Sequence, residues 1–260
     1  MQTCCKYFKF IADVTVTIVL WTYFTIGFVL FFSPFYAAAL FFSKDRRIAF
    51  QKINHRFFKV FLWLLRAIVP GLTIEVDERI PGLRSCVVVS NHRSYLDPVI
   101  FIGSLEKQTT IVKSDFFRVP VLGRVIKTAG YIPSEASSDL SSLMVERIDW
   151  MPEYMAGGGV VFVFPEGTRN RGKGLNPFNI GAFKIARRCN APIEVVCITN
   201  TERLFAPGRF LFNTCVENRI DVRWIGSIVP NDSGHFPVGR LMEESRQMME
   251  KYLESRANSN

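Results

Sequence analysis

The pattern of hydrophobic and polar positions divides the chain into three parts. Residues 14–43 contain no charged side chain, and residues 44–70 are basic with regularly spaced apolar positions. From residue 71 onward, short β-branched runs alternate with segments of helical spacing. Because alternating strands and helices are typical of α/β proteins, we predict that residues 71–260 form one α/β domain with a mainly parallel sheet flanked by helices.

The uncharged segment is the first candidate for contact with a membrane. One helical crossing needs about 20 apolar residues, so residues 14–43 exceed one crossing and fall short of two. Pro34 should kink or end a helix there, and basic residues on both flanks set no orientation. We predict that residues 1–43 form a membrane anchor, and we favour a helical hairpin over one bent or tilted helix. A buried core helix is the alternative.

The next segment, residues 44–70, has the spacing of an amphipathic helix. Its apolar stripe recurs at every fourth position: Ile53, Phe57, Phe61 and Leu65. Basic residues surround the stripe: Lys52, Arg56, Lys59 and Arg66. A basic amphipathic helix that follows an anchor is typical of segments that lie on an anionic membrane surface. An ordinary helix packed on the domain is the alternative.

Within residues 71–260 the pattern predicts the order of strands and helices. Strands are expected within residues 72–76, 85–90, 109–113, 159–164, 193–198 and 220–228. Helical segments are expected within residues 96–105, 116–130, 138–158, 178–191 and 238–256. In such sheets, ligands bind beyond the carboxyl ends of the strands, so the residues that follow each strand are the first candidates for a site.

Composition narrows the classes of partner. The formal net charge is +9, which suits nucleic acid, a membrane surface or anionic substrates. The sequence has no zinc-finger spacing, basic-region heptads or aromatic RNA-binding signature, so we expect no nucleic-acid partner. Three scattered histidines favour no metal site, and we expect His55 and His235 to be structural or surface residues. Six cysteines without a C-x2-C pair favour a reducing cytoplasm.

The segment "VVVSNHRSYLDP" is the first that suggests chemistry. Its strand ends at Ser90, so His92 lies at the carboxyl end, and Asp97 with Pro98 fits the N-cap and first position of a helix. His92 and Asp97 can meet only if a loop joins them, since five steps on one helix would turn them about 140° apart. A histidine with a carboxylate neighbour is a candidate general base. The alternative is a capping aspartate beside an ordinary loop histidine.

The segment "GVVFVFPEGTRNRGKG" repeats this design in the same domain. An apolar strand ends in a polar turn that contains Glu166, Gly167, Thr168 and Arg169. Gly167 allows a close approach of the backbone, and the planar guanidinium of Arg169 suits a phosphate. Arg171 and Lys173 add positive charge. Two polar turns at strand ends favour one shared site.

Together these motifs resemble those of the glycerolipid acyltransferase family, whose best-known members are the 1-acyl-sn-glycerol-3-phosphate acyltransferases. The resemblance rests on "NHRSYLDP" followed by "FPEGTR" and covers about residues 74–198. The stretch "VKSDFFRVPVLGRVIKTAGYIP" is similar to the family's second block, and "APIEVVCI" to its fourth. Two family features are missing. The second block commonly ends in an Arg after its G-x-I turn, whereas here Tyr131, Ile132, Pro133 and Ser134 follow Gly130. The fourth block commonly has another Pro, where Val195 stands.

The resemblance implies transfer of a fatty acyl group from acyl-CoA or acyl-carrier protein to the free hydroxyl of a lysolipid. The default acceptor in the family is 1-acyl-sn-glycerol-3-phosphate, and the product is phosphatidic acid. His92 would take the hydroxyl proton and Asp97 would orient it. Arg169, helped by Lys113, would hold the acceptor phosphate, and Glu166, Gly167 and Thr168 would shape that site. No metal or bound cofactor is implied.

The missing Arg leaves the acceptor open, because the family associates that residue with acceptor phosphate binding. Lyso-ornithine lipid, another lysophospholipid, or a phospholipid donor in place of the thioester are alternatives. A lipid-binding protein without catalytic activity is a further class, which an intact His92–Asp97 pair disfavours. We expect a membrane location, with the bilayer and the lysolipid as partners and the catalytic domain facing the cytoplasm.

Overall fold

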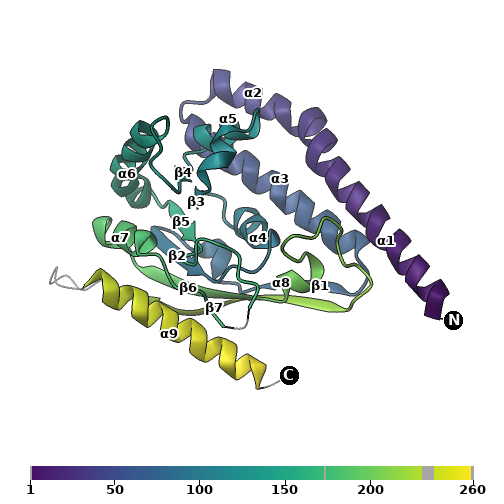
Figure 1. The fold of residues 1–260 in the computed structure, drawn as a ribbon. Coiled ribbons are helices and arrows are strands. Elements are labelled where there is room, and N and C mark those ends of the chain that lie inside the picture. Colours follow the sequence, from purple (N-terminus) through teal and green to yellow (C-terminus); the bar gives the residue numbers. More distant parts are fainter. Residues whose placement is uncertain (1, 173, 230–236, 259–260) are drawn as a thin grey trace.

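The computed structural model describes residues 2–172, 174–229 and 237–258 (Figure 1). Lys173 and His235, named above, lie outside the described residues. The strands of the sheet are β1 Leu72–Val76, β2 Cys86–Ser90, β3 Gln108–Val112, β4 Ile132–Pro133, β5 Val160–Val163, β6 Ile193–Thr199 and β7 Asn218–Ile228. The α-helices are α1 Gln2–Thr22, α2 Ser33–Phe42, α3 Arg46–Ile68, α4 Leu96–Ser104, α5 Leu122–Thr128, α6 Ser141–Ala156, α7 Gly181–Arg188, α8 Thr201–Leu204 and α9 Val238–Ala257. A π-helix, η1 Tyr23–Phe32, joins α1 to α2, and 3-10 turns occur at η2 Ile80–Gly82 and η3 Ser114–Arg118.

The strand order places the predicted motifs side by side. The sheet runs β1-β7-β6-β2-β5-β3-β4, and of its neighbouring pairs only β6 with β7 is antiparallel. The predicted mainly parallel α/β fold is therefore confirmed. Because β2 lies between β5 and β6, the carboxyl ends of these three strands meet at one edge. The sequence pattern missed β4, which has two residues and includes Pro133, a residue tolerated in sheets mainly at edges.

Helices cover both faces of the sheet (Figure 1). Successive side chains of a strand point to opposite faces. In β2, Val88 joins the core under α3 and α4, whereas Val87 and Val89 join the core under α6, α7 and α9. This is why the central strands read as continuous apolar runs: they are buried on both sides.

The N-terminal segment forms one continuous helical path rather than a hairpin. α1, η1 and α2 follow one another from Gln2 to Phe42, and the chain reverses only at residues 43–45 before α3. The hairpin predicted within residues 14–43 is therefore not formed. Pro34 stands at the start of α2, just after the wider π turn, which leaves room for its ring. By length and composition alone, the segment Lys6–Phe42 could cross a membrane.

α3 returns along the N-terminal helix and packs on the domain. Asp45 caps it by accepting a hydrogen bond from the Ile48 amide at 3.0 Å. Phe57, Phe61 and Leu65 of the predicted stripe are buried, and the Tyr23 hydroxyl of η1 donates to the Phe57 carbonyl at 2.7 Å. The packed helix is thus what the structure shows, while contact of the exposed face of α3 with a membrane stays a prediction.

Candidate active site

The loop after β2 brings His92 and Asp97 into direct contact. His92 Nδ1 lies 2.9 Å from Asp97 Oδ2. The Asp97 side chain is fully buried, whereas the His92 side chain is 16% exposed. When Nδ1 donates its proton to the carboxylate, Nε2 of the neutral ring carries a lone pair. The predicted pair therefore has the arrangement of an oriented general base.

Asp97 is not the N-cap that the sequence suggested. α4 begins at Leu96, so Asp97 and Pro98 both lie in its first turn. Asp97 Oδ2 instead accepts hydrogen bonds from the backbone amides of Arg93 and Ser94, at 2.6 and 2.8 Å. The carboxylate closes the loop that precedes the helix, and this closure is what brings His92 within reach.

Asp97 Oδ1, the other carboxylate oxygen, is held by a residue that follows β6. Thr201, which follows β6, donates its hydroxyl to Asp97 Oδ1 at 2.6 Å. Asp97 thus receives four hydrogen bonds, counting the one from His92. Hydrogen bonds to charged groups are stronger than neutral ones, so this buried carboxylate is firmly fixed. The sequence analysis missed Thr201, although it stands at a strand end like the two motifs.

The loop after β5 contacts both the imidazole ring and the backbone of His92. The ring of Phe164 stacks on the His92 imidazole at 4.2 Å between centroids. Glu166 accepts from the His92 amide at 2.9 Å and from the Asn176 amide at 2.8 Å. The Asn170 amide donates to the His92 carbonyl at 2.7 Å. Glu166, predicted to shape the acceptor site, has both oxygens bonded to backbone amides. It thereby ties this loop to residues 91–95 after β2, here called the catalytic loop.

Asn91 fixes the opposite side of the same loop. Its side-chain amide donates to the Ile198 carbonyl and accepts from the Ile198 amide, both at 2.8 Å. The end of β2 is thereby bonded to the end of β6. Asn91 was part of the motif, but the sequence pattern gave it no role.

Gly167 and Thr168 form the tip of the turn after β5. Gly167 has a φ of +67°, and a Cβ at this position would lie 2.8 Å from Asn179 Nδ2. Both the backbone conformation and the space therefore favour glycine. Thr168 is exposed beside it.

Arg169 is the predicted phosphate ligand best placed for that role. Its guanidinium lies 3.5 Å from the centre of the Tyr95 ring. Its Nη1 is buried and has no hydrogen-bond partner among the described residues. A buried donor without an acceptor is costly, so an anion bound beside Tyr95 would satisfy it.

Lys113 lies further along the same edge of the sheet. It follows β3, which is flanked by β5 and β4, and its side chain is 73% exposed with the ammonium 3.1 Å from Asp115. The amide of Ser134, which follows Pro133 of β4, donates to the Val112 carbonyl next to Lys113. Lys113 therefore lies close to the end of the second block, where the family commonly has an Arg.

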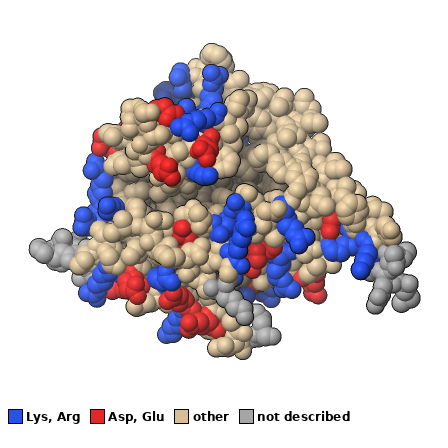
Figure 2. Space-filling view, in the orientation of Figure 1, with Lys and Arg blue, Asp and Glu red and all other residues tan. Residues whose placement is uncertain are grey.

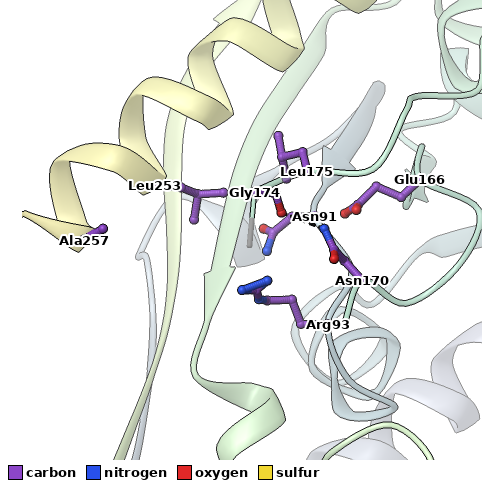
Figure 3. A pocket seen from close by; sticks show the side chains of 8 residues that line it. All are labelled: Asn91, Arg93, Glu166, Asn170, Gly174, Leu175, Leu253 and Ala257. Atoms are coloured by element: carbon purple, nitrogen blue, oxygen red, sulfur yellow. Dashed lines mark hydrogen bonds between the residues drawn. The ribbon is translucent and has the colours of Figure 1, made fainter. Parts of the chain in front are cut away.

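A pocket of about 350 Å³ lies behind the His92 backbone. Figure 3 shows Asn91, Arg93, Glu166 and Asn170 facing Leu175 and, from α9, Leu253. The Arg93 guanidinium spans the space between the catalytic loop and the Gly172 carbonyl, to which it donates at 3.1 Å. Because the residues that bond the His92 amide and carbonyl line this pocket, its packing affects the position of the catalytic loop.

Metal ligation receives no support from the side chains of the described residues. No group of three or more His, Cys, Asp or Glu side chains is placed to hold an ion in that part of the chain. His55, the other described histidine, directs Nδ1 to the Ile102 carbonyl at 3.1 Å and contributes to helix packing. The absence of a metal from the reaction stays a prediction.

Comparison with known proteins now identifies the family. The family described as Acyltransferase matches residues 71–199. The chain belongs to this family. The matched residues include every site residue that the sequence predicted, and they end two positions before Thr201.

Curated relatives and a solved structure agree with this assignment. The chain is 31% identical over 172 residues to a chloroplastic 1-acyl-sn-glycerol-3-phosphate acyltransferase of Brassica napus, which covers 65% of this chain and 48% of the relative. It is 30% identical over 161 residues to a 1-acyl-sn-glycerol-3-phosphate acyltransferase of Borreliella burgdorferi, with 60% of each chain covered. The chain thus spans about half to three-fifths of the length of these two relatives.

The fold is also that of a solved member. The crystal structure of the 1-acyl-sn-glycerophosphate (LPA) acyltransferase PlsC from Thermotoga maritima superimposes with a TM-score of 0.73 at 22% identity, and the match covers 96% of this chain and 98% of that one. At this identity the likeness supports the fold, and it extends over the N-terminal helices as well as the sheet.

Proposed function

We propose that this acyltransferase moves a fatty acyl group from a thioester, acyl-CoA or acyl-carrier protein, to the free hydroxyl of 1-acyl-sn-glycerol-3-phosphate, giving phosphatidic acid. The observation that carries the proposal is the contact of 2.9 Å between His92 Nδ1 and the buried Asp97 carboxylate. A lipid-binding protein would need an anion site but no such base. The substrates named for the relatives fit the positive charge around the site.

The reaction follows from the state of the His92 ring. Nε2 takes the proton of the acceptor hydroxyl as its oxygen attacks the thioester carbonyl carbon. The imidazolium that forms is stabilised by Asp97. When the tetrahedral intermediate collapses, the C–S bond breaks and the proton passes to the departing sulfur. The products are the ester and the free thiol, and no protein atom becomes acylated.

Acceptor binding is proposed for Arg169 and Lys113. The buried, unpartnered Nη1 of Arg169 beside Tyr95 supports a phosphate contact close to the base. Lys113 supplies a second cation on the same edge of the sheet, next to Ser134. We propose that Lys113 compensates for the Arg that is missing from the second block.

Membrane association is proposed from the N-terminal helix. No charged residue occurs from residue 14 to residue 43, and Figure 2 shows a broad surface without charge on the side of the N-terminal helix. A lysolipid and its diacyl product both stay in the bilayer, so an apolar helix beside the site keeps the enzyme with its substrate. The catalytic domain would face the cytoplasm, where acyl thioesters are found.

The test uses membranes that contain the wild-type chain or the His92→Ala variant. Each receives radiolabelled palmitoyl-CoA or palmitoyl-acyl-carrier protein with lysophosphatidic acid or, separately, lyso-ornithine lipid. We expect labelled phosphatidic acid from the wild type and none above background from the variant. Preferential labelling of the ornithine lipid would overturn the acceptor assignment. Lipid binding without transfer from either donor would overturn the enzymatic proposal.

A further inference from the structure

Three polar residues of α1 share one side of the helix. Lys9, Asp13 and Thr17 are spaced four apart, which places them within about 80° of one another. The opposite side carries Tyr7, Ile11 and Ile18, all exposed. The polar side must therefore have a partner in the protein, while the apolar side has none in the described part of the chain.

The partner of the polar side is the segment 205–214, here called the docking loop. Asp13 Oδ1 accepts hydrogen bonds from both the amide and the hydroxyl of Thr214, each at 2.7 Å. The Phe212 amide donates to the Thr17 hydroxyl oxygen at 3.0 Å. Lys9 Nζ donates to the Asn213 side-chain oxygen at 2.6 Å. These bonds hold the docking loop against the N-terminal helix.

The tip of the docking loop presents an aromatic ring and a cation to solvent. The Phe210 side chain is 67% exposed and stacks on Trp21 of α1, which is 38% exposed, with centroids 5.6 Å apart. Arg209 precedes it and is exposed, as is Arg203 on α8. Within the described residues neither arginine forms an ion pair. Figure 2 shows basic side chains gathered below the central hollow, next to the uncharged surface.

We propose that the docking loop is a second membrane-binding element, which seats the catalytic domain on an anionic bilayer. Phe210 and Trp21 would enter the boundary between headgroups and acyl chains, and Arg203 and Arg209 would contact lipid phosphates. Two features favour a bilayer: the aromatic pair continues the apolar surface of α1, and the charge next to it is positive. The inference rests on the proposed membrane contact of the N-terminal helix.

The docking loop is also bonded to the catalytic loop. The Ser94 hydroxyl donates to the Phe205 carbonyl at 2.6 Å. The Phe205 ring contacts Tyr95 and stacks on Phe212, 4.3 Å away. The docking loop thus connects the proposed membrane surface to Ser94 and Tyr95, and Tyr95 also contacts Arg169. Its seating sets the height of His92 above the lipid headgroups.

The first experiment maps the contact directly. The full-length protein in vesicles of phosphatidylcholine and phosphatidylglycerol carries a photoreactive phenylalanine analogue at position 210 or, as control, at position 180. Ile180 is also exposed and precedes α7, which covers the other face of the sheet. We expect lipid adducts from position 210 and none from position 180. Absence of lipid adducts at position 210 would overturn the proposal, whether or not the enzyme is active.

The second experiment separates seating from catalysis. Phe210→Ser and Arg209→Gln are assayed with oleoyl lysophosphatidic acid in the vesicles and with a hexanoyl analogue dissolved in water. We expect about a fivefold loss with the bilayer acceptor and no change with the dissolved one. Equal losses with both acceptors would contradict the proposal. A raised KM for palmitoyl-CoA alone would also contradict the proposal, because it would indicate a site for the donor phosphates instead. Arg171 is close enough to contribute to such a site, since its Nη2 lies 3.7 Å from the position that a Cβ of residue 208 would take.

Discussion

Thr201 offers a sharp test of how the site is held together. Its hydroxyl donates to Asp97 Oδ1 at 2.6 Å, and Asp97 is fully buried. Thr201→Val keeps the shape of the side chain but removes the hydroxyl that donates to this oxygen. A hydrogen bond to a charged group contributes about 1.5–3 kcal/mol. Each 1.36 kcal/mol in the barrier is a factor of ten in rate, so the loss has an upper limit of roughly a hundredfold.

We expect about a tenfold fall in kcat for Thr201→Val, because the backbone amides of Arg93 and Ser94 still hold Asp97 Oδ2. The KM for the acceptor should stay unchanged, since Thr201 does not contact the proposed phosphate ligand. Thr201→Ser, which retains the hydroxyl, is the matched control and should keep most of the activity. Initial rates of phosphatidic acid formation at saturating donor measure both. A Val variant within twofold of wild type, or a Ser variant as slow as Val, would refute the positioning role.

Three further predictions follow from single residues. Gly167→Ala should lower the free energy of unfolding by about 1–3 kcal/mol, measured by thermal denaturation in detergent, because the residue has φ +67° and a Cβ would also displace the Asn179 side chain; an unchanged Tm would contradict this. Arg169→Lys should raise the KM for lysophosphatidic acid about tenfold with little change in kcat, and an unchanged KM would argue against phosphate binding there. Burial lowers the pKa of the His55 imidazole. Below the ordinary pKa near 6.5 the unfolded state therefore binds more protons, and stability falls as pH falls. His55→Gln should flatten this dependence of Tm on pH, and an identical dependence would show that His55 is not its source.

The sequence was most informative where one local pattern determined the outcome. The apolar runs of β2 and β5 predicted buried strands, and the polar residues after them predicted a site at the sheet edge. His92 and Asp97 were paired correctly because a loop was the only way to join them. Gly167 was singled out as a glycine that the turn requires, and its φ is positive.

The sequence was least informative where contacts between distant segments decide. The hairpin expected before residue 43 is absent because the helical backbone continues from η1 into α2, with Pro34 in the first turn of α2, where a proline is tolerated. Asp97 is not a cap because its carboxylate bonds amides upstream of the helix. Nothing near Thr201 in the chain indicates a bond to Asp97, 104 residues away. The stripe of Lys9, Asp13 and Thr17 was visible as spacing, but its partner, the docking loop, lies about 200 residues further on.

The residues that fix the catalytic loop also line the pocket beside it. Asn91, Glu166 and Asn170 line it and also fix the strand end or the His92 backbone. Interiors transmit changes in packing because they are dense. A change in the packing of this pocket, for instance at Leu253 on α9, would therefore also act on the catalytic loop.

The most direct test of the account is the release of free thiol from palmitoyl-CoA by purified enzyme, followed with and without lysophosphatidic acid. If His92 activates the acceptor hydroxyl itself, thiol appears only when the acceptor is present, in equal amount to the phosphatidic acid formed, and His92→Ala abolishes both. A burst of thiol without acceptor, equal in amount to the enzyme, would show that a protein group is acylated first. That result would contradict the central claim that the acyl group passes directly from the thioester to the acceptor hydroxyl, with His92 as the general base.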